Sequence, residues 1–170
     1  MTDLPTGTVT FLFTDLEGST RLWEQHPEAM RDALARHDEI LREAVEKRDG
    51  VVVKTTGDGL HAAFASAHDA VLAAVDGQRA LDAIDWPLPE VIRVRMGLHT
   101  GEAALRDGDY FGTAVNLAAR AVAIGEPGRV VVDARVRDAL AAHSREQVAA
   151  LGDHLLKGFE EPVALFALLQ

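Results

Sequence analysis

Two aspartates follow segments whose composition favours β-strands. Asp15 ends the β-branched and aromatic run 8–14, and in a regular strand it would share a face with that run's alternate apolar side chains. Asp58 lies in the turn 56–59 and stands in the same alternating relation to the apolar segment 60–64. Two carboxylates about 4 Å apart repel each other by roughly 4 kcal/mol at an effective dielectric constant near 20. Either one carboxyl keeps its proton or a divalent cation lies between them, unless both are ordinary turn residues.

The loop after Asp15 has the composition of a phosphate-binding turn. Segment 15–20 reads Asp-Leu-Glu-Gly-Ser-Thr. Gly18 allows close approach of the backbone, and the start of the next helix presents unpaired N–H groups. Ser19 or Thr20 can equally be the cap of a short helix. Carboxylates beside such a loop favour Mg²⁺ over Zn²⁺, because Mg²⁺ prefers hard oxygen donors and substrate phosphates.

The elements that must hold these residues follow from the hydrophobic pattern. Two long helices are predicted, one over 28–47 and one from a capping box at 66–69 to Ile84. The order of elements is β-α-β-β-α-β, which indicates an α+β fold with a ferredoxin-like core and both helices on one face of an antiparallel sheet. The four strands are predicted at 8–14, 51–53, 60–64 and 91–100.

Residues after Gly101 are expected to add a C-terminal αβ elaboration to this core. The predicted elements are a charged turn at 106–109, a helix at 113–124, a strand at 129–132, a helix at 133–142, a further cap at 144–147, and a closing strand pair at 151–156 and 163–168 around Lys157 and Gly158.

Composition excludes several classes of protein. The 170 residues carry a net charge of −10, which argues against a broad nucleic-acid or anionic-membrane surface. No apolar stretch approaches the roughly 18 residues of a membrane span, and the N-terminus lacks a secretion signal. The absence of cysteine removes disulfides and thiolate chemistry. We expect a single domain over residues 1–170 in the cytoplasm, with the seven histidines as surface or core groups.

Three motifs together carry a resemblance to a known family. In their order and spacing they resemble the catalytic domain of class III nucleotide cyclases, particularly bacterial adenylate cyclases, from Thr8 to about Leu168. The resemblance implies the class III cyclase fold and favours a metal site at Asp15 and Asp58. The motifs are Phe13-Thr14-Asp15-Leu16-Glu17-Gly18-Ser19-Thr20, Lys54-Thr55-Thr56-Gly57-Asp58-Gly59 and Asp109-Tyr110-Phe111-Gly112-Thr113-Ala114-Val115-Asn116-Leu117-Ala118-Ala119-Arg120.

The first two motifs imply a metal and phosphate site. By the resemblance, Asp15 and Asp58 bind two divalent cations, Mg²⁺ or Mn²⁺, and the backbone carbonyl of Leu16 is a further ligand. The residues whose backbone is expected to wrap the β- and γ-phosphates are Glu17, Gly18, Ser19 and Thr20.

The remaining matches imply how the base and the reacting phosphate are held. Lys54 and Asp109 match the pair that reads the adenine edge in adenylate cyclases. Asn116 and Arg120 match the transition-state pair, and their i, i+4 spacing puts both on one face of a helix. Lys157 matches a lysine that contacts the terminal phosphates.

The activity implied is conversion of ATP to 3′,5′-cyclic AMP and pyrophosphate. In the family, a head-to-tail homodimer builds each site from both chains, so the partners expected are ATP and a second copy. Two alternatives remain open: a catalytically silent nucleotide-binding regulatory module, and a guanylate or dual-specificity cyclase.

Overall fold

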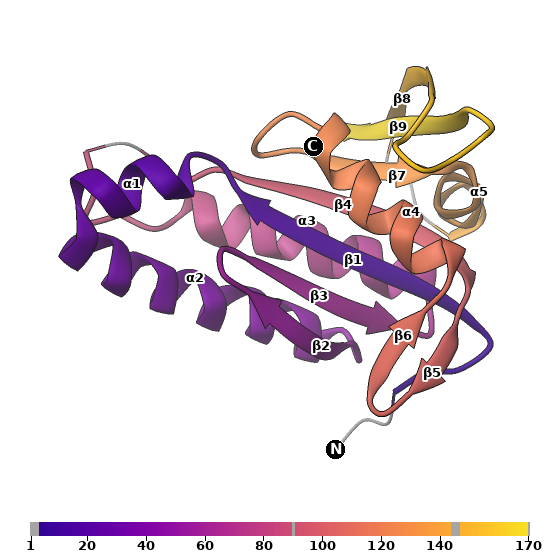
Figure 1. Cartoon of the computed structure of the whole chain (residues 1–170), viewed down its shortest axis with the longest axis horizontal. Coiled ribbons are helices and arrows are strands. Elements are labelled where there is room, and N and C mark those ends of the chain that lie inside the picture. Colours follow the sequence, from indigo (N-terminus) through magenta and orange to yellow (C-terminus); the bar gives the residue numbers. More distant parts are fainter. Residues whose placement is uncertain (1–3, 90, 144–146, 170) are drawn as a thin grey trace.

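A computed structural model describes residues 4–89, 91–143 and 147–169. In this part of the chain the main sheet has the strand order β2-β3-β1-β4-β7-β9-β8, and β5 and β6 form a separate hairpin. Helix α3 lies behind the sheet, whereas α4 lies in front of it (Figure 1). The elements are β1 Thr8–Leu16, α1 Ser19–Gln25, α2 Pro27–Lys47, β2 Val51–Thr56, β3 Gly59–Phe64, α3 Ala67–Asp82, β4 Val94–Glu102, β5 Ala104–Arg106, β6 Asp109–Phe111, α4 Thr113–Ala121, a 3₁₀ turn Val122–Ile124, β7 Val130–Asp133, α5 Ala134–His143, β8 Gln147–His154 and β9 Val163–Leu169.

Strand β1 divides its side chains between two cores. Leu12 and Leu16 are buried in the large cluster that includes the apolar faces of α2 and α3. Phe11 points to the other face of the sheet, where it belongs to a cluster with Tyr110 and Ala118. This alternation is the period-two pattern of a strand, and it packs β6 and α4 against the face of the sheet opposite α2 and α3.

The predicted βαββαβ core is confirmed. Strands β2, β3, β1 and β4 are neighbours in that order, and each adjacent pair is antiparallel. The capping box before α3 is also confirmed, because the Ser66 hydroxyl accepts a hydrogen bond from the backbone N–H of Asp69 at 3.2 Å. Strand β7 then joins β4 in parallel, which a chain can do only after a crossover. Helix α4 provides that crossover, and the complete sheet is mixed.

Several predicted boundaries were wrong, among them those of β4 and of the charged turn. Strand β4 runs from Val94 to Glu102, because its register with the nine residues of β1 pairs Leu16 with Val94 and Thr8 with Glu102. The charged turn expected at 106–109 is the end of the β5–β6 hairpin. Its turn contains only Asp107 and Gly108, with φ values of 51° and 76°, and an Asp-Gly pair suits the positive φ of a two-residue hairpin turn.

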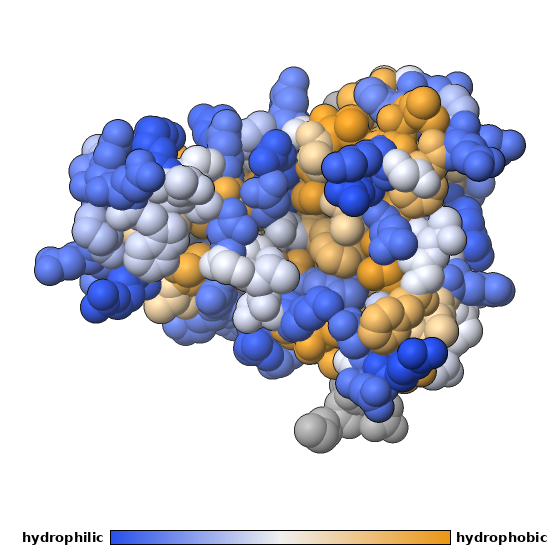
Figure 2. Space-filling model, viewed as in Figure 1, coloured by the Kyte–Doolittle hydropathy of each residue, from blue (hydrophilic) through white to orange (hydrophobic). Residues whose placement is uncertain are grey.

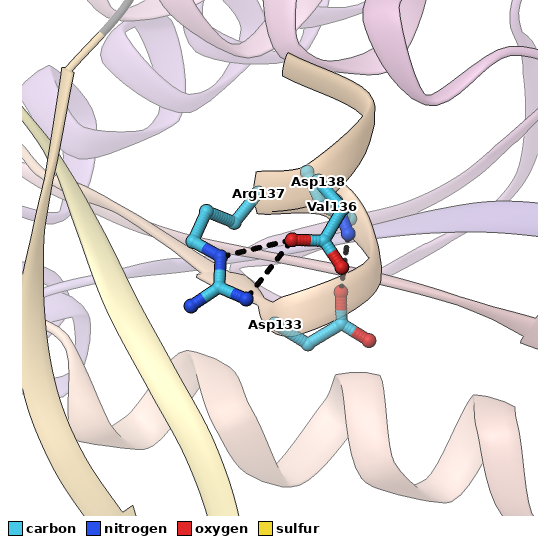
Figure 3. Close-up of polar contacts among 4 residues, drawn as sticks. All are labelled: Asp133, Val136, Arg137 and Asp138. Atoms are coloured by element: carbon cyan, nitrogen blue, oxygen red, sulfur yellow. Dashed lines mark hydrogen bonds and ion pairs between the residues drawn. The ribbon is translucent and has the colours of Figure 1, made fainter. Parts of the chain in front are cut away.

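The C-terminal elaboration follows the prediction in outline. Asp133 is the cap of α5 rather than its first residue: its Oδ1 accepts a hydrogen bond from the backbone N–H of Val136 at 2.9 Å, while Arg137 pairs with Asp138 (Figure 3). Strands β8 and β9 form the closing pair, with β8 beginning earlier than predicted. The predicted cap at 144–147 falls mainly on 144–146, outside the described residues. Among the described helices, none is both long and apolar enough to cross a membrane.

Candidate active site

Sheet register brings Asp15 and Asp58 to the same end of the sheet. Asp15 is opposite Gly59 on β3 and opposite Arg95 on β4. The backbone N–H of Leu16 donates to the carbonyl oxygen of Asp58 at 3.2 Å, so the two aspartates adjoin through their backbones. Asp15 lies on the face of Phe11, as predicted.

The route by which Asp58 reaches this point differs from the expectation. Its alternation with strand 60–64 would place it on the helix-covered face, because Leu60, Ala62 and Phe64 belong to the core beneath α2 and α3. Asp58 instead precedes β3, in the turn after Thr56, and a turn does not follow strand alternation. The backbones of Asp15 and Asp58 therefore adjoin, as the predicted pairing requires, but the argument from strand alternation does not apply to Asp58.

Each aspartate already has one partner. Arg95 donates from Nη2 to Oδ2 of Asp15 at 2.7 Å, and the two side chains are 29% and 30% exposed. Ser19 donates its hydroxyl to Oδ2 of Asp58, also at 2.7 Å. Ser19 is therefore not the cap of α1: that position is taken by Gly18, with φ 71° and no side-chain cap bond. The loop after Asp15 therefore binds the carboxylate of Asp58 through the hydroxyl of Ser19.

The donor set fits a divalent cation of the Mg²⁺ type. Two carboxylates and adjacent backbone carbonyls are the hard oxygen ligands that Mg²⁺ prefers. Within the described residues, no group of three or more His, Cys, Asp or Glu side chains forms a metal site. The carboxylate pair would therefore need oxygens from elsewhere, such as backbone carbonyls, water or substrate phosphate, to complete a coordination shell.

A bulge in β2 directs Lys54 toward Asp109. The register of β2 with β3 shifts between Val52 and Lys54, so that Lys54 pairs with His61. In a regular register Val53 would pair with His61 and Lys54 with Leu60. Because Leu60 belongs to the core beneath α2 and α3, Lys54 would then face the helices. As it is, Nζ of Lys54 lies 2.8 Å from Oδ2 of Asp109.

The Asp109 carboxylate is held as an anion. The hydrogen bond from Lys54 is the largest influence that lowers the pKa of this carboxyl, and the backbone N–H of Tyr110, which donates to Oδ1 at 2.8 Å, lowers it further. The pair therefore presents an ammonium donor beside a carboxylate acceptor, although both side chains remain partly open to solvent.

A buried histidine lies beside this pair. His61 is 1% exposed, and neither of its ring nitrogens has a hydrogen-bond partner. Its ring stacks on Phe13, with centroids 4.1 Å apart and an angle of 16°, and Tyr110 approaches edge-on. Burial, followed by the charge of Lys54, lowers the pKa of His61 to about 4. At neutral pH the ring is therefore an uncharged part of an aromatic layer beneath Lys54.

A second group of polar side chains lines a hollow of about 610 Å³. Asn116 and Arg120 lie one turn apart on α4, and Lys157 comes from the connection between β8 and β9. The prediction that Asn116 and Arg120 share one face of a helix agrees with this arrangement, and Lys157 lines the same hollow. The hollow is lined by Thr113, Asn116, Arg120, Lys157, Gly158, Phe159, Glu160 and Glu161, a set without the two aspartates or the Lys54–Asp109 pair.

Comparison with known proteins decides the family. Residues 1–170 match the family described as the adenylate and guanylate cyclase catalytic domain. The chain belongs to this family.

Relatives and solved structures agree with this assignment. An uncharacterized protein of Mycobacterium tuberculosis is 40% identical over 162 residues, which cover 93% of this chain and 54% of that protein. The cyclase domain thus spans about half the length of that relative. A structure from an analysis of Trypanosoma brucei adenylate cyclases in their monomeric state has a TM-score of 0.88 and 31% identity, over 96% of this chain and 90% of that one. A Silicibacter pomeroyi structure described as an adenylate/guanylate cyclase/hydrolase has a TM-score of 0.81 and 34% identity, over 96% and 97%.

The cyclase domain therefore has the expected class III fold, and two of its site-adjacent residues escaped the sequence analysis. Arg95 lies in the predicted strand 91–100, where alternation gives the face of a residue but not its partner. His61 was counted among unremarkable histidines. Its position in the sequence could have indicated its role, because it lies three residues after Asp58 within an otherwise apolar strand. Burial of a polar ring in such a strand costs free energy unless the ring forms hydrogen bonds.

Proposed function

We propose that this cyclase domain is an adenylate cyclase, which converts ATP to 3′,5′-cyclic AMP and pyrophosphate. The observation that carries the proposal is the Lys54–Asp109 pair, a donor and an acceptor fixed 2.8 Å apart. Adenine offers an acceptor at N1 and a donor at its 6-amino group. Guanine offers the reverse, a donor at N1 and an acceptor at O6. For a given orientation of the bound base, a donor and an acceptor in fixed positions can therefore form both hydrogen bonds with adenine or with guanine, but not with both bases.

The metal site of the proposal consists of Asp15 and Asp58 with the carbonyl of Leu16. Two Mg²⁺ or Mn²⁺ ions bound there would lower the pKa of the attacking hydroxyl and neutralise the leaving pyrophosphate. The backbone of residues 17–20 faces the β- and γ-phosphates, and its N–H groups and the start of α1 favour anions.

The reacting phosphate is met by the residues of the hollow. The 3′-hydroxyl oxygen attacks the α-phosphorus in line, the new ester bond forms as the bond to pyrophosphate breaks, and the hydroxyl proton passes to solvent water. Arg120 stabilises the charge that grows on the phosphate oxygens, and Asn116, one turn before it, orients the ribose and phosphate. Lys157 binds the terminal phosphates. Because the reaction is intramolecular, most of the rate depends on holding the ribose and phosphate in the attack geometry.

Each site is built by two chains in a head-to-tail homodimer. The hollow with Asn116, Arg120 and Lys157 contains neither Asp15 nor Asp58, so the carboxylates of one protomer complete the hollow of its partner. The surface supports association: Phe111 is 51% and Leu105 is 38% exposed on the β5–β6 hairpin. Figure 2 shows apolar side chains between the charged ones on the face that carries α4, most densely toward the β8–β9 end. Two-fold symmetry then gives two equivalent sites.

Product formation from the purified chain tests the proposal. The chain is incubated with ATP or GTP and with Mg²⁺ or Mn²⁺, at a concentration where it is dimeric, and the cyclic nucleotide is measured. Cyclic AMP from ATP, with much less cyclic GMP from GTP, supports the proposal. Comparable products from both indicate dual specificity. Nucleotide binding without any product indicates a silent binding module and overturns the proposed activity.

A further inference from the structure

The hairpin that carries Asp109 is anchored to the rest of the domain mainly through one side chain. Strands β5 and β6 form a two-stranded sheet of their own, separate from the seven-stranded one. Among residues 104–111, all of which the structure describes, Tyr110 alone is buried, with 3% of its surface exposed. Alternation along β6 places Asp109 and Phe111 on the other side of the strand. The position of Asp109 therefore depends on what holds Tyr110.

Tyr110 is held along its whole length. Its backbone N–H donates to Oδ1 of Asp109 at 2.8 Å. Its ring packs edge-on against Phe11, with centroids 5.0 Å apart and an angle of 73°, and approaches the buried ring of His61 in the same way. At its far end, the hydroxyl donates to the backbone carbonyl of Pro5 at 2.6 Å. One residue thus connects the carboxylate of the base-reading pair to the sheet and to the chain before β1.

The contact with Pro5 is a firm anchor. Burial raises the pKa of Tyr110 to about 12, so the hydroxyl keeps its proton and donates at neutral pH. The acceptor lies in a segment of limited freedom, because the proline ring fixes φ and Leu4 packs against the cluster that contains Phe11 and Tyr110. In Figure 1 the chain before β1 passes beside the β5–β6 hairpin. The hairpin is therefore fastened to a segment 105 residues earlier in the sequence.

The other member of the base-reading pair is less constrained. The side chain of Lys54 is 50% exposed, and its flexible four-carbon stem lets the ammonium follow the carboxylate. The position of Asp109 thus sets where both groups lie. A donor and an acceptor distinguish adenine from guanine only while their positions are fixed, since a pair that is free to shift can form one hydrogen bond with either base.

We propose that Tyr110 is a positioning residue for base recognition, which acts through Asp109 and has the carbonyl of Pro5 as its anchor. The segment before β1, outside the proposed site residues, thereby contributes to the choice between ATP and GTP. The anchor adds affinity for adenine nucleotides and little for guanine nucleotides. This inference rests on the proposed base-reading role of Lys54 and Asp109, and it assigns part of the selectivity to a contact outside that pair.

Equilibrium binding of nucleotide analogues tests the inference without turnover. Analogues of ATP and GTP whose α,β-bridging oxygen is replaced by methylene are titrated into the full chain with Mn²⁺, and the dissociation constants are measured by calorimetry. Tyr110→Phe removes the hydroxyl and keeps the ring. Thr10→Val is the matched control, because it removes another buried hydroxyl, which bonds that of Thr100 at 2.7 Å. Thr10 pairs with Phe64 on the helix-covered face, away from the base-reading pair.

The affinity of Tyr110→Phe for the ATP analogue is expected to fall about three- to tenfold, the range of one ordinary hydrogen bond. Its affinity for the GTP analogue should change by less than about twofold. In turnover, KM for ATP rises while kcat is retained, since Asn116 and Arg120 stay in place. Thr10→Val loses comparable thermal stability and keeps the wild-type preference. Wild-type affinities in Tyr110→Phe, or equal losses for both analogues, would overturn the inference.

A double-mutant cycle tests the anchor itself. Pro5→Gly frees φ of the acceptor residue and should weaken the same hydrogen bond, with a smaller loss of affinity for the ATP analogue than in Tyr110→Phe. The double variant should lose no more affinity than Tyr110→Phe alone, because two changes to one contact are not additive. Additive losses would contradict the role of Pro5.

Lys54→Met separates failure of this inference from failure of the proposed function. If Lys54→Met loses the preference for the ATP analogue whereas Tyr110→Phe keeps it, the base-reading pair stands, and Tyr110 is only a part of the aromatic core. If Lys54→Met keeps the preference, the pair does not read the base, and the inference fails with that assignment.

Discussion

Lys54 and Asp109 are 55 residues apart in sequence, yet their side chains meet at 2.8 Å. The contact depends on two local irregularities rather than on regular strand geometry. The bulge at Val53 turns Lys54 away from the helices, and the tight turn at Asp107-Gly108 folds β6 back so that Asp109 pairs with Arg106. The proposed base-reading pair therefore depends on one backbone irregularity beside Lys54 and another beside Asp109.

Replacing Lys54 tests the base-reading role. Lys54→Met keeps the length of the side chain but removes the ammonium, which leaves Asp109 and the purine N1 without their donor. We expect kcat/KM for ATP to fall about 10- to 100-fold, the range of a lost charge-assisted hydrogen bond. Lys47→Met, at the exposed end of α2, is the matched control and should retain wild-type kinetics. Equal kinetics for the two variants would count against the assignment.

Gly59 is predicted to be indispensable to the carboxylate end of the sheet. A Cβ atom at this position would lie 2.2 Å from the carbonyl oxygen of Thr14, and both belong to fixed backbone. Gly59→Ala must separate β1 from β3 beside Asp15, and we expect it to lower the free energy of unfolding by about 3 kcal/mol. Gly57→Ala is the matched control, because its Cβ would meet nothing within 4 Å. Denaturant unfolding compares them, and equal midpoints would contradict this role.

His61 should make the protein less stable in acid. Its pKa is 6.5 in an ordinary environment and about 4 when buried beside Phe13. Between these values the unfolded chain binds a proton that the folded chain excludes, so stability is complete above pH 6.5 and decreases as the pH falls toward 4. The slope from one such group reaches about 1.4 kcal/mol per pH unit.

A substitution isolates this contribution. His61→Leu is similar in size and cannot titrate, so unfolding followed by denaturant between pH 4 and pH 7 should show a shallower loss of stability than in wild type. His37, whose pKa is also lowered by burial, is still present in this variant, so part of the decrease in stability at low pH remains. Parallel curves for wild type and variant would show that His61 is not the titrating group.

Local patterns were enough to predict much of this fold. The hydrophobic period of 28–47 gave α2 almost to the residue, and the capping box at Ser66 gave the start of α3. The motifs also grouped Asp15 with Asp58 and Lys54 with Asp109. The features that these patterns did not predict depend on pairing between strands that are distant in the sequence.

The bulge at Val53, the register that sets the ends of β4, and the partner of Arg95 are each fixed by a neighbouring strand, so no local pattern reports them. The Asp107-Gly108 hairpin is the exception. An Asp-Gly pair is a recognised turn signal, but its charged surroundings favoured an open turn over two short strands.

Mixing two inactive variants tests the shared site most directly. Asp15→Asn removes a carboxylate and leaves the hollow intact, whereas Arg120→Ala disables the hollow and leaves both carboxylates. Each variant alone should form almost no cyclic AMP. In an equimolar mixture, half of the dimers combine the two variants, and one of the two sites in each such dimer is intact. We therefore predict about a quarter of the wild-type rate per chain. No recovery despite demonstrated mixed dimers would contradict a site built from two chains, as would full activity of the wild-type chain as a monomer.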